Sequence, residues 1–333
     1  MLKKLTVLAV GWGLSLSALA VDVATLIKQA ESGNISSQEK LADYYRRIQD
    51  HENESYWTEK LANLGNVVAQ FNIGVNYENG KGVDQDYTKA IEWYQKSANQ
   101  GYADAQFNLG GMFRDGKGVK KDYSKAIYWY KQSSNQGNAK ALFNLGVIYD
   151  EGKFVQKDYL RALNYYQESA DKGLADAQLN LGVMYRQGKG IKQDYSKAMY
   201  WYSKALEQNL PSAANNLGVM YMDGLGVKKD YQKALILFEQ SANQNFAPAI
   251  ANLGVMYRKG LGVPKDYNKA LNLYRLAASM GNIGAYDNLG IMYLNAYGVE
   301  RDINTAKSFF QYACNKDYIL GCEHYQELNE QGY

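Results

Sequence analysis

Apolar side chains recur along this chain at the three- and four-residue spacing that is typical of amphipathic helices. One helix is predicted over residues 103–115, and the apolar positions on its inner face are Ala105, Leu109, Met112 and Phe113. Two glycines follow this segment closely, and glycine readily ends a helix. The pattern therefore predicts a helix of about three turns followed by a tight loop.

A second helix is predicted between Asp122, which is a good N-cap residue, and Gly137, which suits the position after a helix C-terminus. Its apolar and small side chains form one stripe that we expect to be buried, made of Ala126, Ile127, Trp129, Tyr130 and Ser133. Seven Asp residues stand in this register, counting this one, and they are expected to cap helices rather than to form an active site. The segment 103–138 is thus predicted to be a helix–loop–helix hairpin.

This hairpin pattern repeats with a period of 36 residues. A glycine within the first helix marks the register, at Gly74, Gly110, Gly146, Gly182, Gly218, Gly254 and Gly290. The position that ends the second helix contains only residues that tolerate a left-handed backbone, namely Gly65, Gly101, Gly137, Gly173, Asn209, Asn245, Gly281 and Asp317. A fixed period of this length predicts stacked helical units rather than one globular core. Because glycine inside a helix costs about 1 kcal/mol relative to alanine, we expect a neighbouring helix to approach it closely with its Trp-Tyr pair.

The pattern is irregular at both ends, as is usual for the terminal units of repeat stacks. One hairpin with a shorter loop is predicted upstream of the regular units, and Ser36 with Glu39 suggests a capping box at its start. We expect a lone capping helix over 23–34, repeats over 35–318 and a closing helix over 319–333.

The first 20 residues differ in kind from the repeats. Two lysines precede a short apolar run, which ends in Ala-Leu-Ala with a cleavage site near Ala20, as in a secretory signal peptide. The run is too short to span a membrane. We therefore predict a signal peptide over 1–20 and a single solenoid domain over 21–333. The mature chain is expected to be periplasmic or secreted, without membrane insertion after signal cleavage.

Composition narrows the possible partners. Signal cleavage removes two positive charges and lowers the formal net charge from +3 to about +1. Such a balance does not favour nucleic acid as a partner. The two cysteines, Cys314 and Cys322, lie close together near the C-terminus, and in an exported chain such a pair predicts a disulfide rather than a redox-active site.

Catalytic chemistry is poorly supported. The two histidines, His51 and His324, lie at opposite ends of the repeat array, so they cannot build a Ser/His/Asp or Cys/His site without a long-range fold-back. No zinc-type ligand spacing is present in the sequence. A partial phosphate-loop pattern at 111–117 and a Ser-x-x-Lys at 37–40 lack their companion residues. We predict that the protein is not an enzyme and uses no cofactor and no metal.

Three recurring sequence motifs together resemble those of a known family. They are Asp-Ala-Gln-Phe-Asn-Leu-Gly, best seen at 104–110, the Gly-Lys-Gly-Val loop and the Asp-Tyr-x-Lys-Ala helix start. They are similar to the Sel-one-like repeat (SLR), a relative of the tetratricopeptide repeat, over roughly 35–330. The resemblance implies an all-α fold, a right-handed α-solenoid of about eight helix–loop–helix repeats with capping helices at both ends. It also implies that first helices line a concave groove and that the protein holds other proteins. The cysteine spacing resembles that of cysteine-rich SLR proteins, in which such a pair joins a hairpin to the next helix.

Two columns of first-helix residues are candidates for binding a protein in that groove. The first column is asparagine, at Asn72, Asn108, Asn144, Asn180, Asn216, Asn252 and Asn288. Asparagine is a mediocre helix former, so its recurrence needs a cause. The amides either bond a neighbouring helix or loop, or form a ladder of donors and acceptors for a partner's extended backbone.

The second column lies six residues later and varies in charge, as a partner-specific surface would, although a solvated face is the plainer interpretation. Its members are Glu78, Arg114, Asp150, Arg186, Met222, Arg258 and Leu294. A third column changes from Phe107, Phe143 and Leu179 to Asn215, Ala251 and Asp287, and predicts a more apolar N-terminal half of the groove if it faces there.

The leading hypothesis is a periplasmic or secreted scaffold that binds a protein segment in its concave groove. One alternative is a cell-wall or β-lactam-binding protein with weak hydrolase activity, which rests on the likeness to cysteine-rich SLR proteins alone. Another alternative, a special case of the first, is an inhibitor or immunity protein against an exported toxin.

Overall fold

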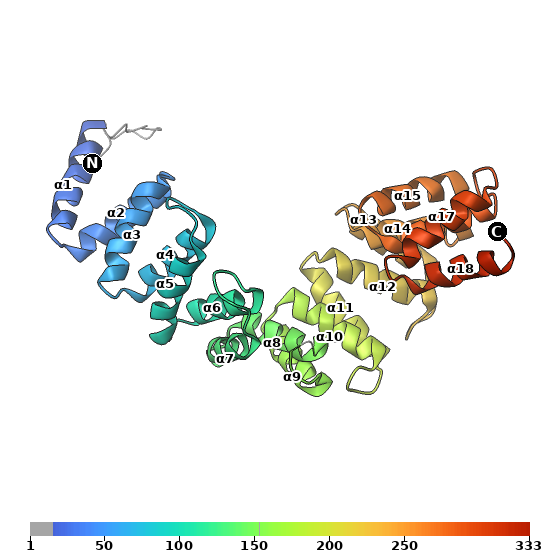
Figure 1. Ribbon diagram of the computed structural model, residues 1–333, viewed down its shortest axis with the longest axis horizontal. Helices are drawn as coiled ribbons and strands as arrows, with labels where there is room; N and C mark the ends of the chain where they lie inside the picture. Colours follow the sequence, from blue (N-terminus) through green and yellow to red (C-terminus); the bar gives the residue numbers. More distant parts are fainter. Residues whose placement is uncertain (1–15, 153) are drawn as a thin grey trace. The chain divides into compact units, whose positions relative to one another are not determined.

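A computed structural model describes residues 16–152 and 154–333, and within these ranges the chain forms eighteen α-helices and no strands (Figure 1). The described residues divide into two compact units, and the boundary in the chain lies between Lys157 and Asp158. The helices of the N-terminal unit are α1 (Leu16–Glu31), α2 (Ile35–Arg47), α3 (His51–Asn63), α4 (Val67–Asn79), α5 (Tyr87–Asn99), α6 (Ala103–Asp115), α7 (Tyr123–Ser134) and α8 (Ala139–Glu151). Those of the C-terminal unit are α9 (Tyr159–Asp171), α10 (Ala175–Gln187), α11 (Tyr195–Glu207), α12 (Pro211–Asp223), α13 (Tyr231–Ala242), α14 (Ala247–Lys259), α15 (Tyr267–Ser279), α16 (Ile283–Leu294), α17 (Ile303–Cys314) and α18 (Ile319–Glu330).

Within each unit, every helix packs against the helix before it and the helix after it, as Figure 1 shows for the N-terminal unit. The tightest pairs are the predicted hairpins, such as α4 with α5 and α6 with α7. The predicted all-α repeat of helix pairs with a 36-residue period is confirmed, and it makes an α-solenoid.

The N-terminal end differs in detail from the sequence-based expectation. Most of the predicted signal peptide, residues 1–15, lies outside the described residues, and the described part of α1 already includes Leu16, upstream of the start expected at residue 23. The predicted capping box is wrong. Asn34 is the N-cap residue of α2, and its side chain accepts a hydrogen bond from the backbone N–H of Ser37.

The helix ends of the regular units follow the predicted chemistry. Asp122 caps α7 by accepting from the backbone N–H of Lys125 at 3.0 Å. The same capping is made by Asp86, Asp158, Asp194, Asp230, Asp266 and Asp302. After the second helices the backbone is left-handed even where the residue is not glycine, as at Asn209, Asn245 and Asp317. The turn geometry is therefore the same in each unit although its residue changes.

The expected close approach to the helical glycines is confirmed. A Cβ atom on Gly74 would lie 2.7 Å from a ring carbon of Tyr94, which is closer than real Cβ contacts. Comparable contacts join Gly110 with Tyr130, Gly182 with Tyr202, Gly218 with Phe238, Gly254 with Tyr274 and Gly290 with Phe310. Each of these rings is completely or almost completely buried. An aromatic ring that packs against the backbone of a helical glycine thus lies at the centre of these hairpins. This contact explains why glycine recurs there although it destabilises the helix relative to alanine.

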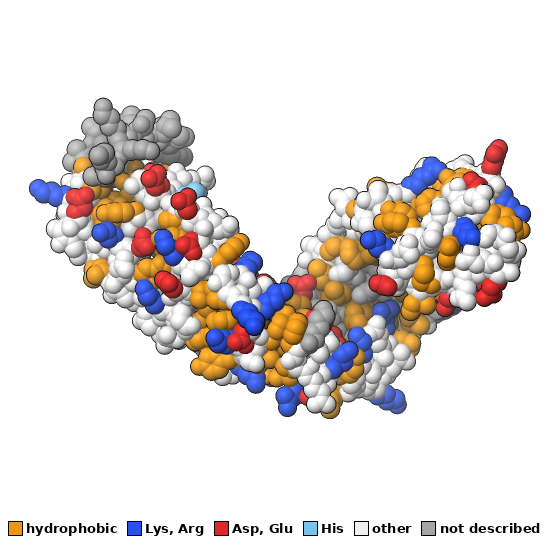
Figure 2. Space-filling model, in the orientation of Figure 1, with side chains coloured by type: hydrophobic (Ala, Val, Ile, Leu, Met, Phe, Trp, Pro, Cys, Tyr) orange, Lys and Arg blue, Asp and Glu red, His pale blue; other side chains and the backbone are white. Residues whose placement is uncertain are grey.

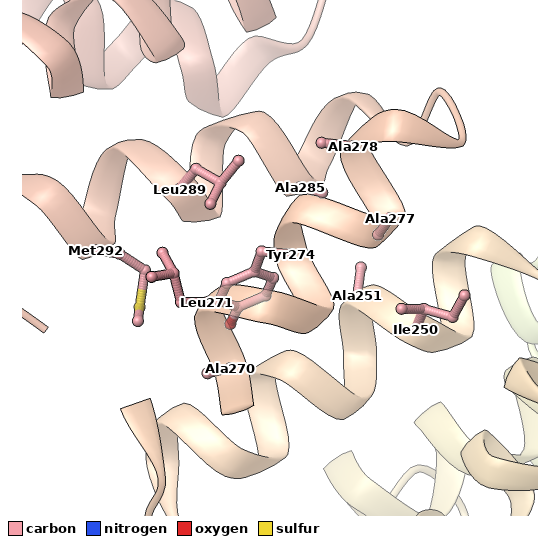
Figure 3. Close-up of a cluster of buried hydrophobic side chains, with 10 residues drawn as sticks. All are labelled: Ile250, Ala251, Ala270, Leu271, Tyr274, Ala277, Ala278, Ala285, Leu289 and Met292. Atoms are coloured by element: carbon pink, nitrogen blue, oxygen red, sulfur yellow. The ribbon is translucent and has the colours of Figure 1, made fainter. Parts of the chain in front are cut away.

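Small side chains let the helices close around each ring. Figure 3 shows this arrangement in the C-terminal unit, where Tyr274 of α15 lies among residues of α14, α15 and α16. Ala270, Ala277 and Ala285 are fully buried around it. The core is therefore a thin layer between consecutive helices, renewed at each repeat, rather than one large interior.

The predicted disulfide is confirmed and joins Cys314 at the end of α17 to Cys322 in α18. It fixes the closing helix, whose packing partners are α17 and, more weakly, α16. Among the described helices, none has the length and apolar character needed to cross a bilayer.

Candidate functional site

The buried rings connect the two candidate columns. Tyr94 donates a hydrogen bond from its hydroxyl to the Glu78 carboxylate at 2.7 Å, and the Asn108 amide donates to the same hydroxyl at 3.1 Å. Glu78 lies four residues after Gly74, the helical glycine against which the Tyr94 ring packs, and Asn108 belongs to the next repeat. We call a glycine in this position the seat glycine. We use the term ring site for such a set, which consists of the seat glycine, the ring, the flanking residue four positions after the glycine, and the asparagine of the next repeat.

Two further ring sites, in the C-terminal unit, also place a charged flanking residue next to the tyrosine. The Arg258 Nε atom donates to the Tyr274 hydroxyl at 3.1 Å. Burial raises the pKa of Tyr202 to about 12, although the nearby Arg186 acts in the opposite direction. The flanking residue of each of these sites therefore carries a charge next to a phenol.

The flanking residue is apolar where the ring has no hydroxyl. Phe238 replaces the tyrosine in one site and Phe310 in another, and the flanking residues there are Met222 and Leu294. The charge in this column therefore varies with the type of ring, because the flanking residue is charged beside a tyrosine and apolar beside a phenylalanine. Sequence reasoning missed this rule, although the paired changes from Tyr to Phe and from charged to apolar were available as a signal.

The asparagine column has contacts of more than one kind. Asn108 bonds the preceding ring, Asn252 donates to Asn215 at 2.8 Å, and Asn288 donates to the Gly284 carbonyl within its own helix. All seven asparagines are half-buried. The structural interpretation of this column therefore holds for several members, while its role in binding a partner stays a prediction.

The closing helix continues the column with a different residue. His324 lies 36 positions after Asn288, and its Nδ1 atom is 2.7 Å from a carboxylate oxygen of the buried Asp287. Burial raises the pKa of Asp287, although His324 and Arg258 oppose that effect. This pair links α16 to α18 beside the disulfide, and it occupies the position of the Asn215–Asn252 pair.

One hollow of about 190 Å³ lies over α6, α7 and α8 and brings together two predicted binding residues, Arg114 and Asn144. The Arg114 guanidinium makes a bidentate contact with Asp115 at 2.7 and 2.9 Å, and this contact lowers the pKa of that carboxyl group. Phe154 stacks on Tyr123 at the edge of the hollow and is 54% exposed.

The buried phenol of Tyr130 lies close to Arg114 and Asn144, which both line this hollow. Burial raises the pKa of Tyr130 to about 12, and its hydroxyl makes no hydrogen bond of good geometry to a described residue. Asn144 lies beside it. A buried hydroxyl without a well-aligned partner is unusual in a folded protein.

A second hollow of about 330 Å³ lies over the irregular first hairpin, and Asn72 of the predicted column lines it together with Ala42, Arg46, Thr58 and Leu61. Both hollows belong to the N-terminal unit, where acidic and basic side chains alternate over the surface seen in Figure 2.

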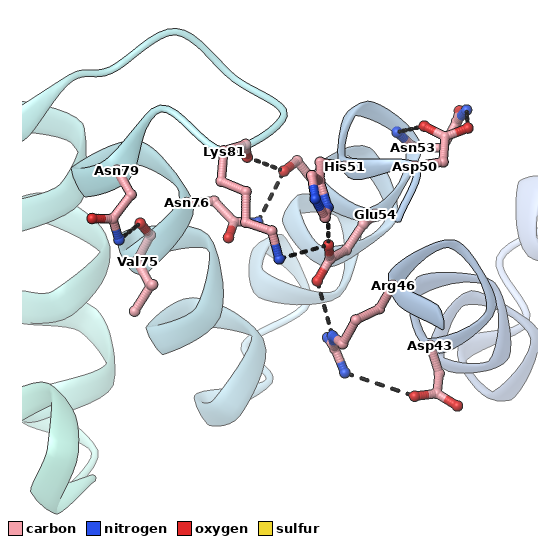
Figure 4. A network of polar contacts seen from close by, with 11 residues as sticks. Asp43, Arg46, Asp50, His51, Asn53, Glu54, Val75, Asn76, Asn79 and Lys81 are labelled. Carbon is pink, nitrogen blue, oxygen red and sulfur yellow. Dashed lines mark hydrogen bonds and ion pairs between the residues drawn. The ribbon is translucent and has the colours of Figure 1, made fainter. Parts of the chain in front are cut away.

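A buried carboxylate holds one wall of this second hollow in place (Figure 4). Glu54 is 4% exposed and is bonded by Arg46 at 2.8 Å, His51 at 3.1 Å and Lys81 at 3.3 Å. Burial would raise the pKa of Glu54, but these three contacts together hold it below its usual value. Arg46 also reaches Asp43 at 3.8 Å. The guanidinium of Arg46 is therefore fixed at the edge of the hollow by two carboxylates.

The other predicted binding residues are not gathered into one place. Glu78 lies one repeat before Arg114, and Lys117 reaches Glu78 at 3.4 Å. Asp150 and Asn180 belong to different units. Within the described ranges no three His, Cys, Asp or Glu side chains are grouped so that they could hold a metal ion. Both cysteines are in the disulfide.

The comparisons with known proteins agree with this architecture. The sequence pattern of the Sel1 repeat matches seven segments, at 67–102, 103–138, 139–174, 175–210, 211–246, 247–282 and 284–318. No curated protein matches the chain.

Several solved structures match it. A protective antigen of uropathogenic Escherichia coli strains, which displays an SLR fold, is 33% identical with a TM-score of 0.84 and covers 94% of this chain and 68% of its own. A Sel1 repeat protein from Oxalobacter formigenes is 27% identical with a TM-score of 0.70 and covers 98% of both chains. An immunity protein from Pseudomonas aeruginosa is 24% identical over 66% of this chain and 83% of its own, with a TM-score of only 0.44.

Proposed function

Because the chain belongs to the Sel1 repeat family, we propose that it is a non-enzymatic scaffold that binds a segment of a partner protein along its first helices. Sel1 repeat proteins generally mediate protein–protein interactions and generally lack enzymatic activity. The position of the partner over the candidate columns is inferred from the chemistry of those columns.

The observation that carries this proposal is the hollow over α6, α7 and α8. It combines a fixed guanidinium at Arg114 and an amide at Asn144 with an exposed aromatic stack, and the buried Tyr130 hydroxyl lies beside these two polar groups. Guanidinium and amide groups suit the backbone of an extended segment, and an exposed ring provides an apolar anchor. Pockets with a few fixed polar groups among apolar walls are typical binding sites.

We further propose that binding occurs outside the cytoplasm. The sequence of the first 20 residues supports export, and the disulfide between Cys314 and Cys322 is of a kind that persists in oxidising compartments. The described helices contain no candidate membrane span.

The test is affinity capture from an envelope extract, with the purified protein as bait and with cross-linking followed by mass spectrometry. We expect one partner to cross-link repeatedly to residues of the first helices. The double variant Arg114→Glu/Phe154→Ala should weaken capture of that partner at least about tenfold, because it reverses a fixed charge and removes an aromatic anchor.

The matched control is Lys131→Glu, which makes the same charge reversal on the exposed outer helix α7. This variant should bind the partner as the parent protein does. The proposal fails if cross-links fall only on second helices, or if the double variant stays folded by circular dichroism and binds undiminished.

A further inference from the structure

The first hairpin aligns with the regular hairpins once its shorter loop is taken into account. Trp57 of α3 lies 36 positions before Trp93 of α5, and the two helices have the same length. Thr58 therefore occupies the position of Tyr94, the ring of the next ring site. On the first helices the offset is 32 residues, because the loop is four residues shorter, and Ala42 then takes the place of the seat glycine Gly74.

This hairpin thus contains a ring site without its ring. The hollow of about 330 Å³ is lined by Ala42 at the seat position, Thr58 at the ring position, Arg46 at the flanking position and Asn72 of the asparagine column. The hollow therefore includes the space that a tyrosine or phenylalanine fills in the other ring sites described above. It is open and partly polar, but it exceeds the volume of about 150 Å³ at which an apolar cavity holds benzene, so an aromatic ring has room in it.

One polar group of the empty ring site, the Thr58 hydroxyl, has no hydrogen-bond partner among the described residues. Thr58 is only 2% exposed, and its hydroxyl makes no hydrogen bond to any described residue, although such groups are normally satisfied. Arg46 is held at the edge by Glu54 and Asp43. In the adjacent site, the equivalents of Arg46 and Asn72 are the two residues that bond the Tyr94 hydroxyl.

We propose that the empty ring site of the first hairpin is a socket for an aromatic side chain of the bound protein segment, with tyrosine preferred over phenylalanine. The inference rests on the proposed function and specifies what one part of the partner must contain. The protein's own ring sites provide the template, since they show which group this arrangement of helices accepts.

The preference for tyrosine follows from the flanking residue. Tyr94 and Tyr274 have charged flanking residues that bond their hydroxyls, whereas Phe238 and Phe310 have apolar ones. Arg46 is charged, so it matches a phenol. The methyl group of Ala42 occupies the depth that the seat glycine leaves free elsewhere, so an incoming ring sits higher than Tyr94 does.

The first experiment titrates the purified protein with N-acetyl-tyrosinamide and N-acetyl-phenylalaninamide and follows the alanine and threonine methyl signals by NMR. We expect saturable shifts at Ala42 and Thr58, and an affinity for the tyrosine compound that is about fivefold higher, as one additional hydrogen bond would give. The double variant Ala42→Gly/Thr58→Tyr places the missing ring in its site and should lower the affinity at least about tenfold.

Two further variants protect the conclusion. Thr58→Met fills the hollow with a flexible side chain and serves if the double variant does not fold. Tyr128→Thr removes an exposed aromatic residue from the outer side of α7 and should leave binding unchanged.

The proposal is overturned if neither compound shifts Ala42 and Thr58, or if the filled variant binds as well as the parent. It is also overturned if the captured partner loses no affinity for the filled variant. In that last case the scaffold function stands as long as Arg114→Glu/Phe154→Ala still releases the partner. If neither pair of changes affects capture, the proposed function fails as well.

Discussion

The first hairpin, α2 with α3, and the second, α4 with α5, share one plan but differ at their centres. In the second, Tyr94 sits on Gly74 and is completely buried. In the first, Thr58 and Ala42 occupy these positions and a hollow remains. The helix lengths are equal, and the stop residues Gly65 and Gly101 have the same left-handed backbone.

The difference shows what each part of the repeat contributes. The N-cap residues and the left-handed residues that end the second helices define the hairpin, because both are present in the first hairpin, where the ring is missing. The ring contributes core volume, and it also closes a site that polar groups surround. Loss of a single ring in a solenoid therefore lowers the stability of that hairpin and leaves a hollow on the surface. The hairpin can remain folded, because each neighbouring repeat contributes its own stabilising interface.

The most direct way to break the comparison is Tyr94→Thr, which gives the second hairpin the residue of the first. Removal of a completely buried ring should cost about 3–5 kcal/mol in the free energy of unfolding, since the transfer term and the cavity term add. Urea unfolding followed by circular dichroism measures the loss. A cost below about 1 kcal/mol would show that the hairpin does not depend on its ring.

A smaller effect comes from Gly74→Ala, which sharpens the role of the seat position. The new methyl group would lie 2.7 Å from the Tyr94 ring, so the single substitution should cost about 1–3 kcal/mol by overpacking. In the background of Tyr94→Thr the same change meets no ring and should stabilise by up to about 1 kcal/mol, because alanine is the better helix former. The sign should therefore reverse, as measured by urea midpoints of the four proteins. Equal effects in both backgrounds would refute the close-approach argument.

Much of this comparison could be derived from the sequence and part of it could not. The Asp122 cap and the left-handed stops follow from local propensities, which act within a few residues, whereas the close approach to Gly110 was inferred from the 36-residue recurrence of a glycine that is costly inside a helix. The predicted start of α2 was wrong because Asn34 and Ser36 are both good N-cap residues. Which of them caps the helix depends on how the chain runs from α1 into the hairpin.

The candidate site was less accessible. Arg114 and Asn144 were identified from the sequence as members of two separate columns. That they line the same hollow depends on how consecutive hairpins stack. The vacancy at Thr58 appears in the sequence only after the shorter loop is aligned, and its volume only in three dimensions. The charges at Glu78 and Arg258 suggested a variable surface, whereas the structure shows that they bond buried phenols.

A third prediction extends the comparison to the matching of ring and flanking residue. Tyr274→Phe leaves Arg258 without its partner hydroxyl and should cost about 1.5 kcal/mol. The double variant Tyr274→Phe/Arg258→Met imitates the natural pair of Phe238 with Met222 and should recover most of that loss. A double-mutant cycle measured by urea unfolding gives the coupling. Additive effects would mean that the charged flanking residues are present for another reason.

The smallest expected effect concerns the pH dependence of the last repeat, where Asp287 replaces the Asn215 of an earlier one. Burial raises the pKa of Asp287 in the folded protein above its ordinary value, while His324 and Arg258 oppose the shift and the nearby Tyr318 is itself affected by the carboxylate. A raised pKa means that the folded state binds the proton more tightly than the unfolded state does. This contribution to stability is complete below the unfolded pKa and is lost as the pH rises through the folded pKa.

Asp287→Asn should therefore leave stability nearly unchanged at acidic pH and increase it slightly at neutral pH, because the amide oxygen can still accept a hydrogen bond from the His324 ring. Hydrogen exchange of the α18 amides at several pH values measures the effect where it acts, and Asn215→Ala in the C-terminal unit provides a control that carries no charge. A variant that is less stable than the parent at neutral pH would show that the ion pair with His324 outweighs the burial of the carboxylate. The last repeat would then be held by charge, where the earlier repeat uses an Asn215–Asn252 amide pair.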